Sequence, residues 1–133
     1  MLTKAKTVLI ADDDPDDVEM FVEALQEIDN HICCLSAGNG YEALQLLNVV
    51  NTPTPDVIFL DLNMPKLNGK QCLIKLKQQE RFADIPVVIF TTSKLDDDNE
   101  EMRRLGAVDF ITKPSKFSDL VHLLTHLLHI SVH

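Results

Sequence analysis

The sequence predicts an α/β protein with a doubly wound parallel sheet of five strands, built from five consecutive strand–helix units, (βα)₅. Five short apolar segments rich in β-branched residues recur along the chain, and helical patterns separate them. Four of these segments are nearly all apolar, which is typical of strands that helices cover on both faces. Right-handed crossovers then place helices on both sides of one sheet. The expected strands are residues 7–11, 32–37, 56–60, 87–91 and 108–112.

The first expected helix follows Asp14, a good N-cap residue, and begins at Pro15, whose fixed φ suits the first helical position. Asp16 and Asp17 favour the positive end of the helix dipole. Apolar residues at helical spacing continue as far as Ile28 and form one stripe. This segment is therefore an amphipathic helix with its apolar side towards the sheet.

Four further helices complete the pattern. The second and third follow the Asn-Gly pairs at 39–40 and 68–69. The fourth is short and strongly charged, at about 97–105, and Gly106 is a natural C-terminal stop. The fifth runs from about 117 to 129 and carries leucines along its apolar side.

Composition narrows the classes of protein. The chain has 133 residues, enough for one domain. We expect a single domain over 1–133, with its core at about 7–129 and no output domain. A net charge of −9 disfavours nucleic acid and anionic membranes as partners. The apolar runs are too short to span a bilayer. Three cysteines, two of them adjacent, make a poor disulfide framework and indicate a reducing compartment, so we expect a cytoplasmic protein.

Polar residues follow the carboxyl ends of four expected strands, where an open parallel sheet binds ligands. They are Asp12 and Asp13, Asp61, Thr91 and Thr92, and Lys113 with Pro114. In a strand order 2-1-3-4-5 these four ends are neighbours. Three carboxylates at one place repel one another, and a hard divalent cation such as Mg²⁺ relieves that repulsion. The cation and the lysine leave a place for a phosphoryl group, and Asp61 would be the nucleophile.

The chain resembles the receiver domain of bacterial two-component response regulators from Val8 to about Leu128. The motifs that carry the resemblance are Val8-Leu-Ile-Ala-Asp12-Asp13, Asp61-Leu-Asn-Met-Pro65 with Gly69, Pro86-Val-Val-Ile-Phe-Thr91-Thr92, Gly106-Ala107 and Phe110-Ile-Thr-Lys113-Pro114. Each motif is weak alone, but all five in order, at strand ends, are specific. The resemblance implies a flavodoxin-like fold and a stand-alone receiver, similar to the chemotaxis type or to receivers paired with phytochrome-type kinases.

The resemblance also implies roles for single residues. Asp61 would accept a phosphoryl group from a phosphohistidine. Mg²⁺, or Mn²⁺, would be held by Asp13, Asp61, the backbone carbonyl of Asn63 and, through a water, Asp12. Phosphate binding and switching would fall to Thr91, Thr92, Lys113 and Phe110. The Lys113–Pro114 peptide would be cis.

As a receiver, the protein would be a switch and not a conventional enzyme, because it would promote only its own phosphorylation and dephosphorylation. A sensor histidine kinase or phosphotransfer protein would act upstream. An unidentified protein target would read the face formed by the fourth helix, the fifth strand and the fifth helix. A homodimer is possible, and neither nucleic acid nor membrane is an expected partner.

Two residues depart from the family pattern. Phe110 stands at the aromatic switch position, so no tyrosine hydroxyl is available there. Thr92 stands where the family usually has alanine or glycine. Its bulk predicts slower access of water to the phosphoryl group and a longer phosphorylated lifetime.

Three alternatives belong to other classes. A flavodoxin-like cofactor binder needs a Gly/Ser/Thr-rich phosphate loop after the first strand, where this chain has aspartates. An aspartyl phosphatase of the haloacid type needs a second aspartate as acid, where this chain has Asn63. The third is a receiver-like interaction module that is constitutive and never phosphorylated.

Overall fold

Five parallel strands form one sheet in the order β2-β1-β3-β4-β5, as the sequence predicts. The computed structural model describes residues 6–92 and 96–131. Its strands are β1 (Thr7–Ala11), β2 (Cys33–Ala37), β3 (Val57–Leu60), β4 (Val87–Thr91) and β5 (Asp109–Thr112). Three strands begin one residue later than predicted. Before β3, for example, the Asp56 carboxylate accepts hydrogen bonds from the backbone N–H groups of Lys6 and Thr7, so this residue anchors the start of β1.

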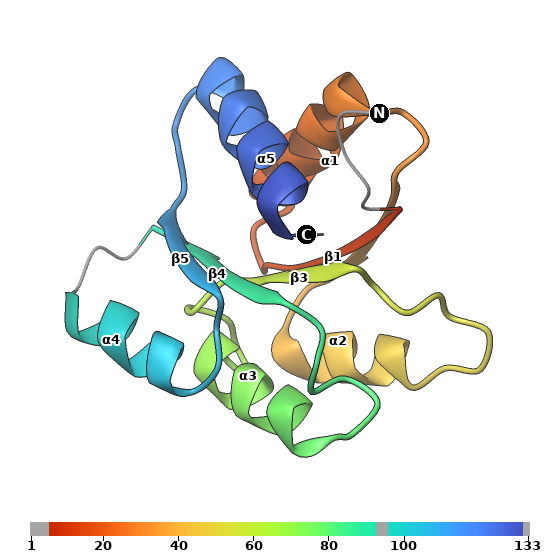
Figure 1. The fold of residues 1–133 in the computed structure, drawn as a ribbon, viewed down its shortest axis with the longest axis vertical. Coiled ribbons are helices and arrows are strands. Elements are labelled where there is room, and N and C mark those ends of the chain that lie inside the picture. Colours follow the sequence, from red (N-terminus) through yellow and green to blue (C-terminus); the bar gives the residue numbers. More distant parts are fainter. Residues whose placement is uncertain (1–5, 93–95, 132–133) are drawn as a thin grey trace.

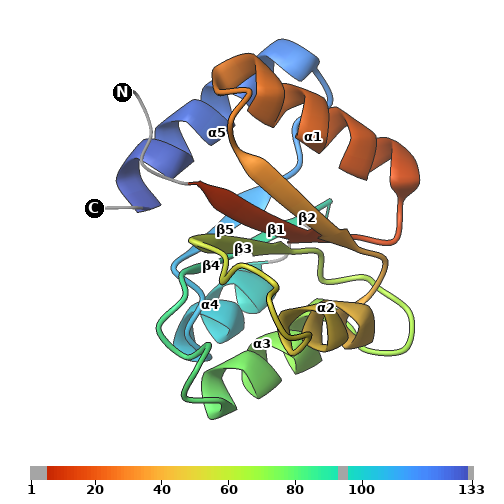
Figure 2. The same cartoon turned by 90° about the vertical axis from the view of Figure 1, so that its right-hand side faces the viewer.

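Helices cover both faces of the sheet, as Figures 1 and 2 show. The helices are α1 (Pro15–Ile28), α2 (Gly40–Leu47), α3 (Gly69–Gln78), α4 (Asp96–Arg104) and α5 (Phe117–Ser131). One layer contains α1 and α5, and the other contains α2, α3 and α4. Within the described part of the chain, no helix combines the length and the apolar character that crossing a membrane requires.

The hydrophobic core is divided between the two faces of the sheet, because successive strand residues point to opposite sides. Leu9 and Ile58 belong to the cluster that packs under α2, α3 and α4. Phe59 belongs to the cluster that packs under α1 and α5, where its ring lies 4.9 Å from that of Phe21 and 6.0 Å from that of Phe90. Burying a large apolar side chain contributes about 1.5–3 kcal/mol, so both layers hold the sheet firmly.

Side-chain caps begin the helices that follow β1, β2 and β3. The Asp14 carboxylate accepts from the N–H of Asp16 at 3.0 Å at the start of α1. The Asn39 side chain accepts from the N–H of Glu42 at 2.9 Å at the start of α2. Asn68 forms a capping box at the start of α3. These caps fix the loops at the carboxyl edge of the sheet.

Two glycines allow close backbone contacts beside the loop after β3. A Cβ atom on Gly69 would lie 2.3 Å from the carbonyl oxygen of Asp61. A Cβ atom on Gly40 would lie 2.6 Å from the carbonyl oxygen of Leu67. Both distances are far below van der Waals contact, so only glycine lets α2 and α3 pack this closely against that loop.

Candidate functional site

Three aspartates from neighbouring strands meet at the carboxyl edge of the sheet. Asp12 and Asp13 directly follow β1, and Asp61 directly follows β3. One carboxylate oxygen from each residue lies within 4.8 Å of the others. Asp12 is 3% exposed and Asp61 is 7% exposed, whereas Asp13 is exposed. The cluster is therefore half enclosed and open on the side of Asp13.

A lysine joins these carboxylates at the same edge of the sheet. Lys113 follows β5, and its side chain is 8% exposed. Its Nζ lies 2.6 Å from Asp12 Oδ2 and 3.2 Å from Asp61 Oδ2. It also lies 2.8 Å from Asp17 Oδ2, in the first turn of α1. The strand-end pattern predicted that the lysine meets the first two carboxylates. The sequence explains Asp17 by the helix dipole alone, because nothing in the sequence links it to a lysine 96 residues away.

In each of the two buried carboxylates, Asp12 and Asp61, one oxygen accepts a backbone hydrogen bond and the other faces the lysine. Oδ1 of Asp12 accepts from the N–H of Asp14 at 3.0 Å, and Oδ1 of Asp61 accepts from the N–H of Asn63 at 3.2 Å. Their Oδ2 atoms face Lys113. Backbone hydrogen bonds therefore fix the orientation of both carboxylates.

Burial and charge oppose each other in this cluster. Burial raises the pKa of Asp12 above its ordinary value, and the contact with Lys113 offsets only part of that effect. Burial by itself lowers the pKa of Lys113, but the contacts with Asp12 and Asp17 and the charge of Asp61 outweigh it and raise the pKa. The raised pKa of Lys113 favours its cationic form, and this one ammonium contacts three carboxylates.

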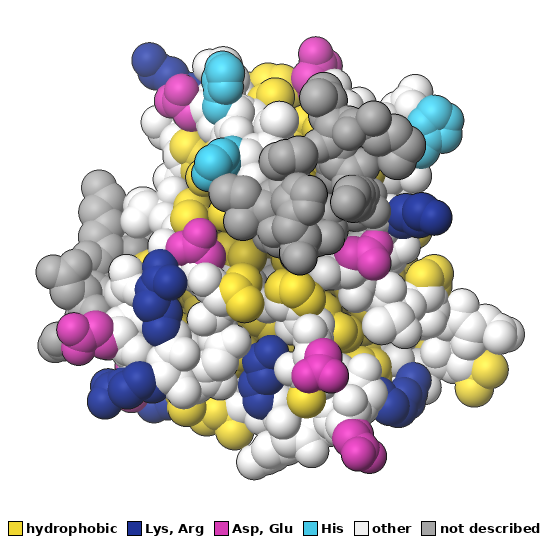
Figure 3. All heavy atoms as spheres, in the orientation of Figure 1, with side chains coloured by type: hydrophobic (Ala, Val, Ile, Leu, Met, Phe, Trp, Pro, Cys, Tyr) yellow, Lys and Arg dark blue, Asp and Glu magenta, His cyan; other side chains and the backbone are white. Residues whose placement is uncertain are grey.

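The segment of the sequence that supplies the three aspartates contains no lysine or arginine. The sequence contains no Lys or Arg between Thr7 and Pro65. Figure 3 draws the side of the molecule opposite the carboxyl edge of the sheet, and there the Lys and Arg side chains lie mostly over the layer of α2, α3 and α4. The donor set of three carboxylates, with one open side, fits a hard divalent cation that prefers oxygen ligands.

The predicted switch residues lie at the end of β4, within β5 and directly after β5. Thr91 is fully buried and Thr92 is exposed. Phe110 is partly buried and packs against the cluster under α2, α3 and α4. The backbone N–H of Lys113 donates to the carbonyl of Thr91 at 2.8 Å, which links the two strand ends. The functions of these residues, and the ligation by the carbonyl of Asn63, stay predictions.

Comparison with known proteins identifies the family. The family model described as the response regulator receiver domain matches residues 8–125. The chain belongs to this family. Response regulator Rcp1 of Synechocystis sp. is 32% identical over 123 residues, which cover 90% of this receiver and 84% of Rcp1. PilH of Pseudomonas aeruginosa is 31% identical over 121 residues, which cover 91% of this receiver and 96% of PilH.

Solved structures agree with this assignment. The phosphorylated cyanobacterial phytochrome response regulator RcpA superposes with a TM-score of 0.85 at 29% identity, over 93% of this receiver and 91% of RcpA. The Mn²⁺-bound form of Rcp1 superposes with a TM-score of 0.81 at 29% identity, over 92% of this receiver and 91% of Rcp1. The observed fold is therefore the flavodoxin-like receiver fold that the sequence predicts.

One prediction for this receiver is wrong. The peptide bond between Lys113 and Pro114 is trans, because the described residues contain no cis peptide bond. The trans isomer is favoured by about 0.5–1 kcal/mol even before proline, so an X–Pro pair does not by itself require the cis form.

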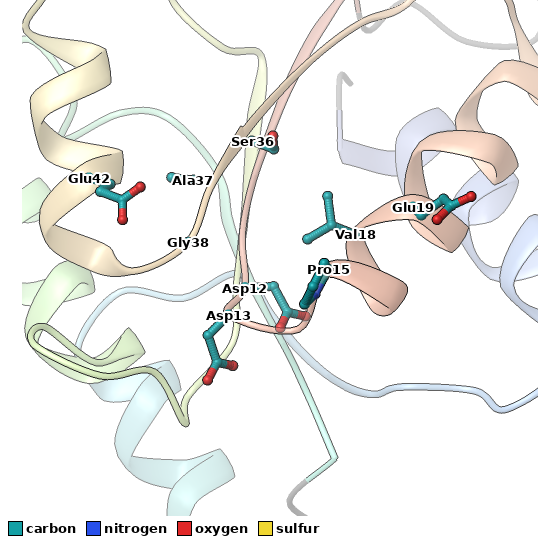
Figure 4. Close-up of a pocket in the computed structure, with 9 residues that line it drawn as sticks. All are labelled: Asp12, Asp13, Pro15, Val18, Glu19, Ser36, Ala37, Gly38 and Glu42. Atoms are coloured by element: carbon teal, nitrogen blue, oxygen red, sulfur yellow. The ribbon is translucent and has the colours of Figure 1, made fainter.

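An acidic hollow lies beside the aspartates of this receiver. It has a volume of about 520 Å³, between the loops that follow β1 and β2. Figure 4 shows Asp12 and Asp13 at the turn into α1, between Glu19 on α1 and Glu42 on α2, which lie on opposite sides of the hollow. Anions that approach Asp13 from this side therefore meet negative charge.

Proposed function

We propose that this receiver is a phosphorylation-dependent signalling switch with Asp61 as the phosphoacceptor. One observation carries the proposal: Asp61 is buried, hydrogen-bonded to the backbone and 3.2 Å from the Lys113 ammonium, beside two further aspartates. This arrangement combines a positioned nucleophile with groups that neutralise phosphoryl charge, which are the main requirements of phosphoryl transfer.

A carboxylate oxygen of Asp61 would attack the phosphorus of a phosphohistidine. The new P–O bond would form as the P–N bond breaks, and the imidazole would keep the electron pair and take up a proton. Lys113 would balance charge on the transferred oxygens. Asp13, Asp61, the carbonyl of Asn63 and, through water, Asp12 would hold Mg²⁺ or Mn²⁺, which supplies charge neutralisation when bound.

The phosphorylated state would be read at the surface formed by α4, β5 and α5. Thr91 would move towards the phosphoryl group, and Phe110 would turn inward behind it. The present positions of both side chains suit these movements, because Thr91 is buried at the strand end and Phe110 is only partly buried. Phosphorylation would thus shift a two-state equilibrium.

A sensor histidine kinase or phosphotransfer protein would be the donor, and an unidentified protein would be the target. Similarity to RcpA, a phytochrome response regulator, supports a histidine kinase upstream. We propose a cytoplasmic location, which suits the free thiols of Cys33, Cys34 and Cys72. A homodimer remains part of the proposal, to be tested by sedimentation with and without phosphorylation.

The test is intact-protein mass spectrometry after incubation with acetyl phosphate, with and without Mg²⁺. We expect one Mg²⁺-dependent phosphoryl adduct on the wild type and none on Asp61→Asn. Asp16→Asn is the matched control, because Asp16 is an exposed aspartate near the site and should leave the adduct intact. A wild type that binds Mg²⁺ but never forms the adduct would favour the constitutive interaction module.

A further inference from the structure

The Lys113 ammonium contacts three carboxylates, one of which lies outside the predicted cation site. It donates hydrogen bonds to Asp17 and Asp61, whereas its contact with Asp12 is an ion pair that leaves Oδ2 of Asp12 without a hydrogen-bond partner among the described residues. Its three partners are Asp12 at 2.6 Å, Asp17 at 2.8 Å and Asp61 at 3.2 Å. Asp12 and Asp61 belong to the cluster that can hold a metal ion, and Asp17 does not.

A divalent cation and Lys113 therefore compete for the same two carboxylates. A cation bound by the cluster draws on Asp12 and Asp61, and it also repels the nearby ammonium. Asp17 is not part of the carboxylate cluster, because it lies in the first turn of α1. Its side chain is 37% exposed, whereas that of Lys113 is 8% exposed.

We propose that Asp17 is a positioning residue that keeps Lys113 at the site when a divalent cation occupies the carboxylate cluster. The proposal rests on the proposed function, since it assigns the cation and Lys113 to the same reaction. Without Asp17, the ammonium can satisfy its charge only on Asp12 and Asp61. Lys113 would then compete more strongly with the cation, and cation binding would weaken.

The neighbouring Asp16 provides a matched comparison. Both aspartates lie in the first turn of α1, so both favour the helix dipole. Asp16 is exposed, and no ion pair of its side chain is found among the described residues, whereas Asp17 contacts Lys113. Asp16→Asn therefore removes the same charge from the same helix turn and leaves the lysine contact in place.

The experiment is a double-mutant cycle on cation binding by the unphosphorylated protein. Mn²⁺ affinity is measured from the electron paramagnetic resonance signal of free Mn²⁺. The proteins are the wild type, Asp17→Asn, Lys113→Met, the double variant and Asp16→Asn. We expect Asp17→Asn to weaken Mn²⁺ binding about fivefold when Lys113 is present, as loss of one partly exposed ion pair implies, and less than about twofold in the Lys113→Met protein.

Equal weakening in both backgrounds would overturn the proposal, because Asp17 would then act as a charge and not through Lys113. The same conclusion would follow from an Asp16→Asn effect as large as that of Asp17→Asn, or from no effect at all. The assay requires no phosphorylation, so failure of Asp61 to accept a phosphoryl group is a separate result.

A second measurement covers the case in which Lys113→Met does not fold. Nuclear magnetic resonance of protein with ¹⁵N-labelled lysine, in saturating Mg²⁺, reports whether the Lys113 Nζ protons are protected from exchange with water. We expect protection in the wild type and in Asp16→Asn, and its loss in Asp17→Asn. Protection that persists in Asp17→Asn would overturn the proposal.

Discussion

Two partly buried lysines at opposite edges of the sheet have opposite electrostatic environments. Lys113, at the carboxyl edge, contacts three carboxylates, and its pKa is raised although burial alone lowers it. Lys77, near the amino end of β4, donates to the carbonyls of Ala83 at 2.8 Å and Ile85 at 3.2 Å. Burial lowers the pKa of Lys77, and the charge of Asp84 offsets this only partly.

Neutral acceptors and charged acceptors thus have different consequences for a buried ammonium. Two carbonyls satisfy the hydrogen bonds of Lys77 but do not compensate for its lost hydration. The carboxylates around Lys113 compensate for the lost hydration of its ammonium group, and the buried carboxylates in turn require the lysine as a counter-charge. This mutual dependence distinguishes the candidate site from a structural contact that ties α3 to the following loop.

Substitution of each lysine should give the largest difference between the two environments, measured as the loss in the free energy of unfolding. We expect Lys113→Met to lower the free energy of unfolding by about 3 kcal/mol in EDTA, because it leaves buried carboxylates without a counter-charge. Lys77→Met should cost only about 1 kcal/mol, since it removes hydrogen bonds to neutral groups. Urea unfolding followed by far-ultraviolet circular dichroism measures both. Similar losses would show that the two environments are energetically alike.

Glycine substitutions at the carboxyl and amino edges of the sheet should differ in their effect on phosphorylation. Gly69→Ala should cost about 2 kcal/mol through overpacking, since its Cβ would overlap the Asp61 carbonyl. We also expect the rate of phosphorylation by acetyl phosphate to fall at least about tenfold, because Asp61 must shift.

Gly106→Ala is the matched control near Lys77. Gly106 has φ 113°, and an added Cβ would lie 3.1 Å from Cε of Lys77, so this variant should lose about 1–2 kcal/mol. Its phosphorylation rate should be unchanged. A slow Gly106→Ala protein would contradict the functional separation of the two edges.

At alkaline pH, Lys113 and Lys77 should affect the stability of the protein in opposite directions. The raised pKa of Lys113 contributes stability that is complete below the ordinary value of 10.5 and is lost as pH rises through the folded value. The lowered pKa of Lys77 has the opposite effect on stability. Its contribution to stability is present above pH 10.5 and is lost as pH falls through the pKa of Lys77 in the folded protein.

Urea midpoints from pH 9 to above pH 10.5 test these signs. Above pH 10.5, the wild type should lose about 1.4 kcal/mol per pH unit relative to Lys113→Met. Relative to Lys77→Met, the wild type should become more stable as pH rises, over a pH range that lies below 10.5. Parallel curves for all three proteins would rule out the opposite shifts.

The sequence was sufficient for the fold because local and long-range signals agree. Apolar strands bounded by polar ends predicted β1 and β4 to the residue and the complete strand order. The same strand ends predicted that the aspartates after β1 and β3 gather at one edge of the sheet and face Lys113.

The features that the sequence did not predict depend on contacts between distant residues, which leave no local pattern in the sequence. Asp17 at a helix start is explained by the dipole, so its contact with Lys113 was missed. The need for glycine at position 69 arises from backbone packing against Asp61. The isomer before Pro114 was wrongly predicted because it was carried over from the family resemblance.

The smallest effect that we predict concerns access of water to the phosphorylated site. Thr92 is exposed directly after the buried Thr91, at a position where a smaller residue would leave more room. We expect Thr92→Ala to shorten the phosphorylated lifetime about threefold, which corresponds to less than about 1 kcal/mol in the barrier. The lifetime is measured by mass spectrometry after removal of acetyl phosphate.

Thr112 is the matched control for Thr92, because it is also exposed and is paired with Thr91 across β4 and β5. Thr112→Ala removes the same atoms from the strand beside Thr91, so its lifetime should equal that of the wild type. If both variants shorten the lifetime equally, the cause is a general loosening of the two strand ends. If only Thr92→Ala does so, the side chain that follows Thr91 shields the phosphoryl group, and the carboxyl edge then controls lifetime by steric exclusion as well as by charge.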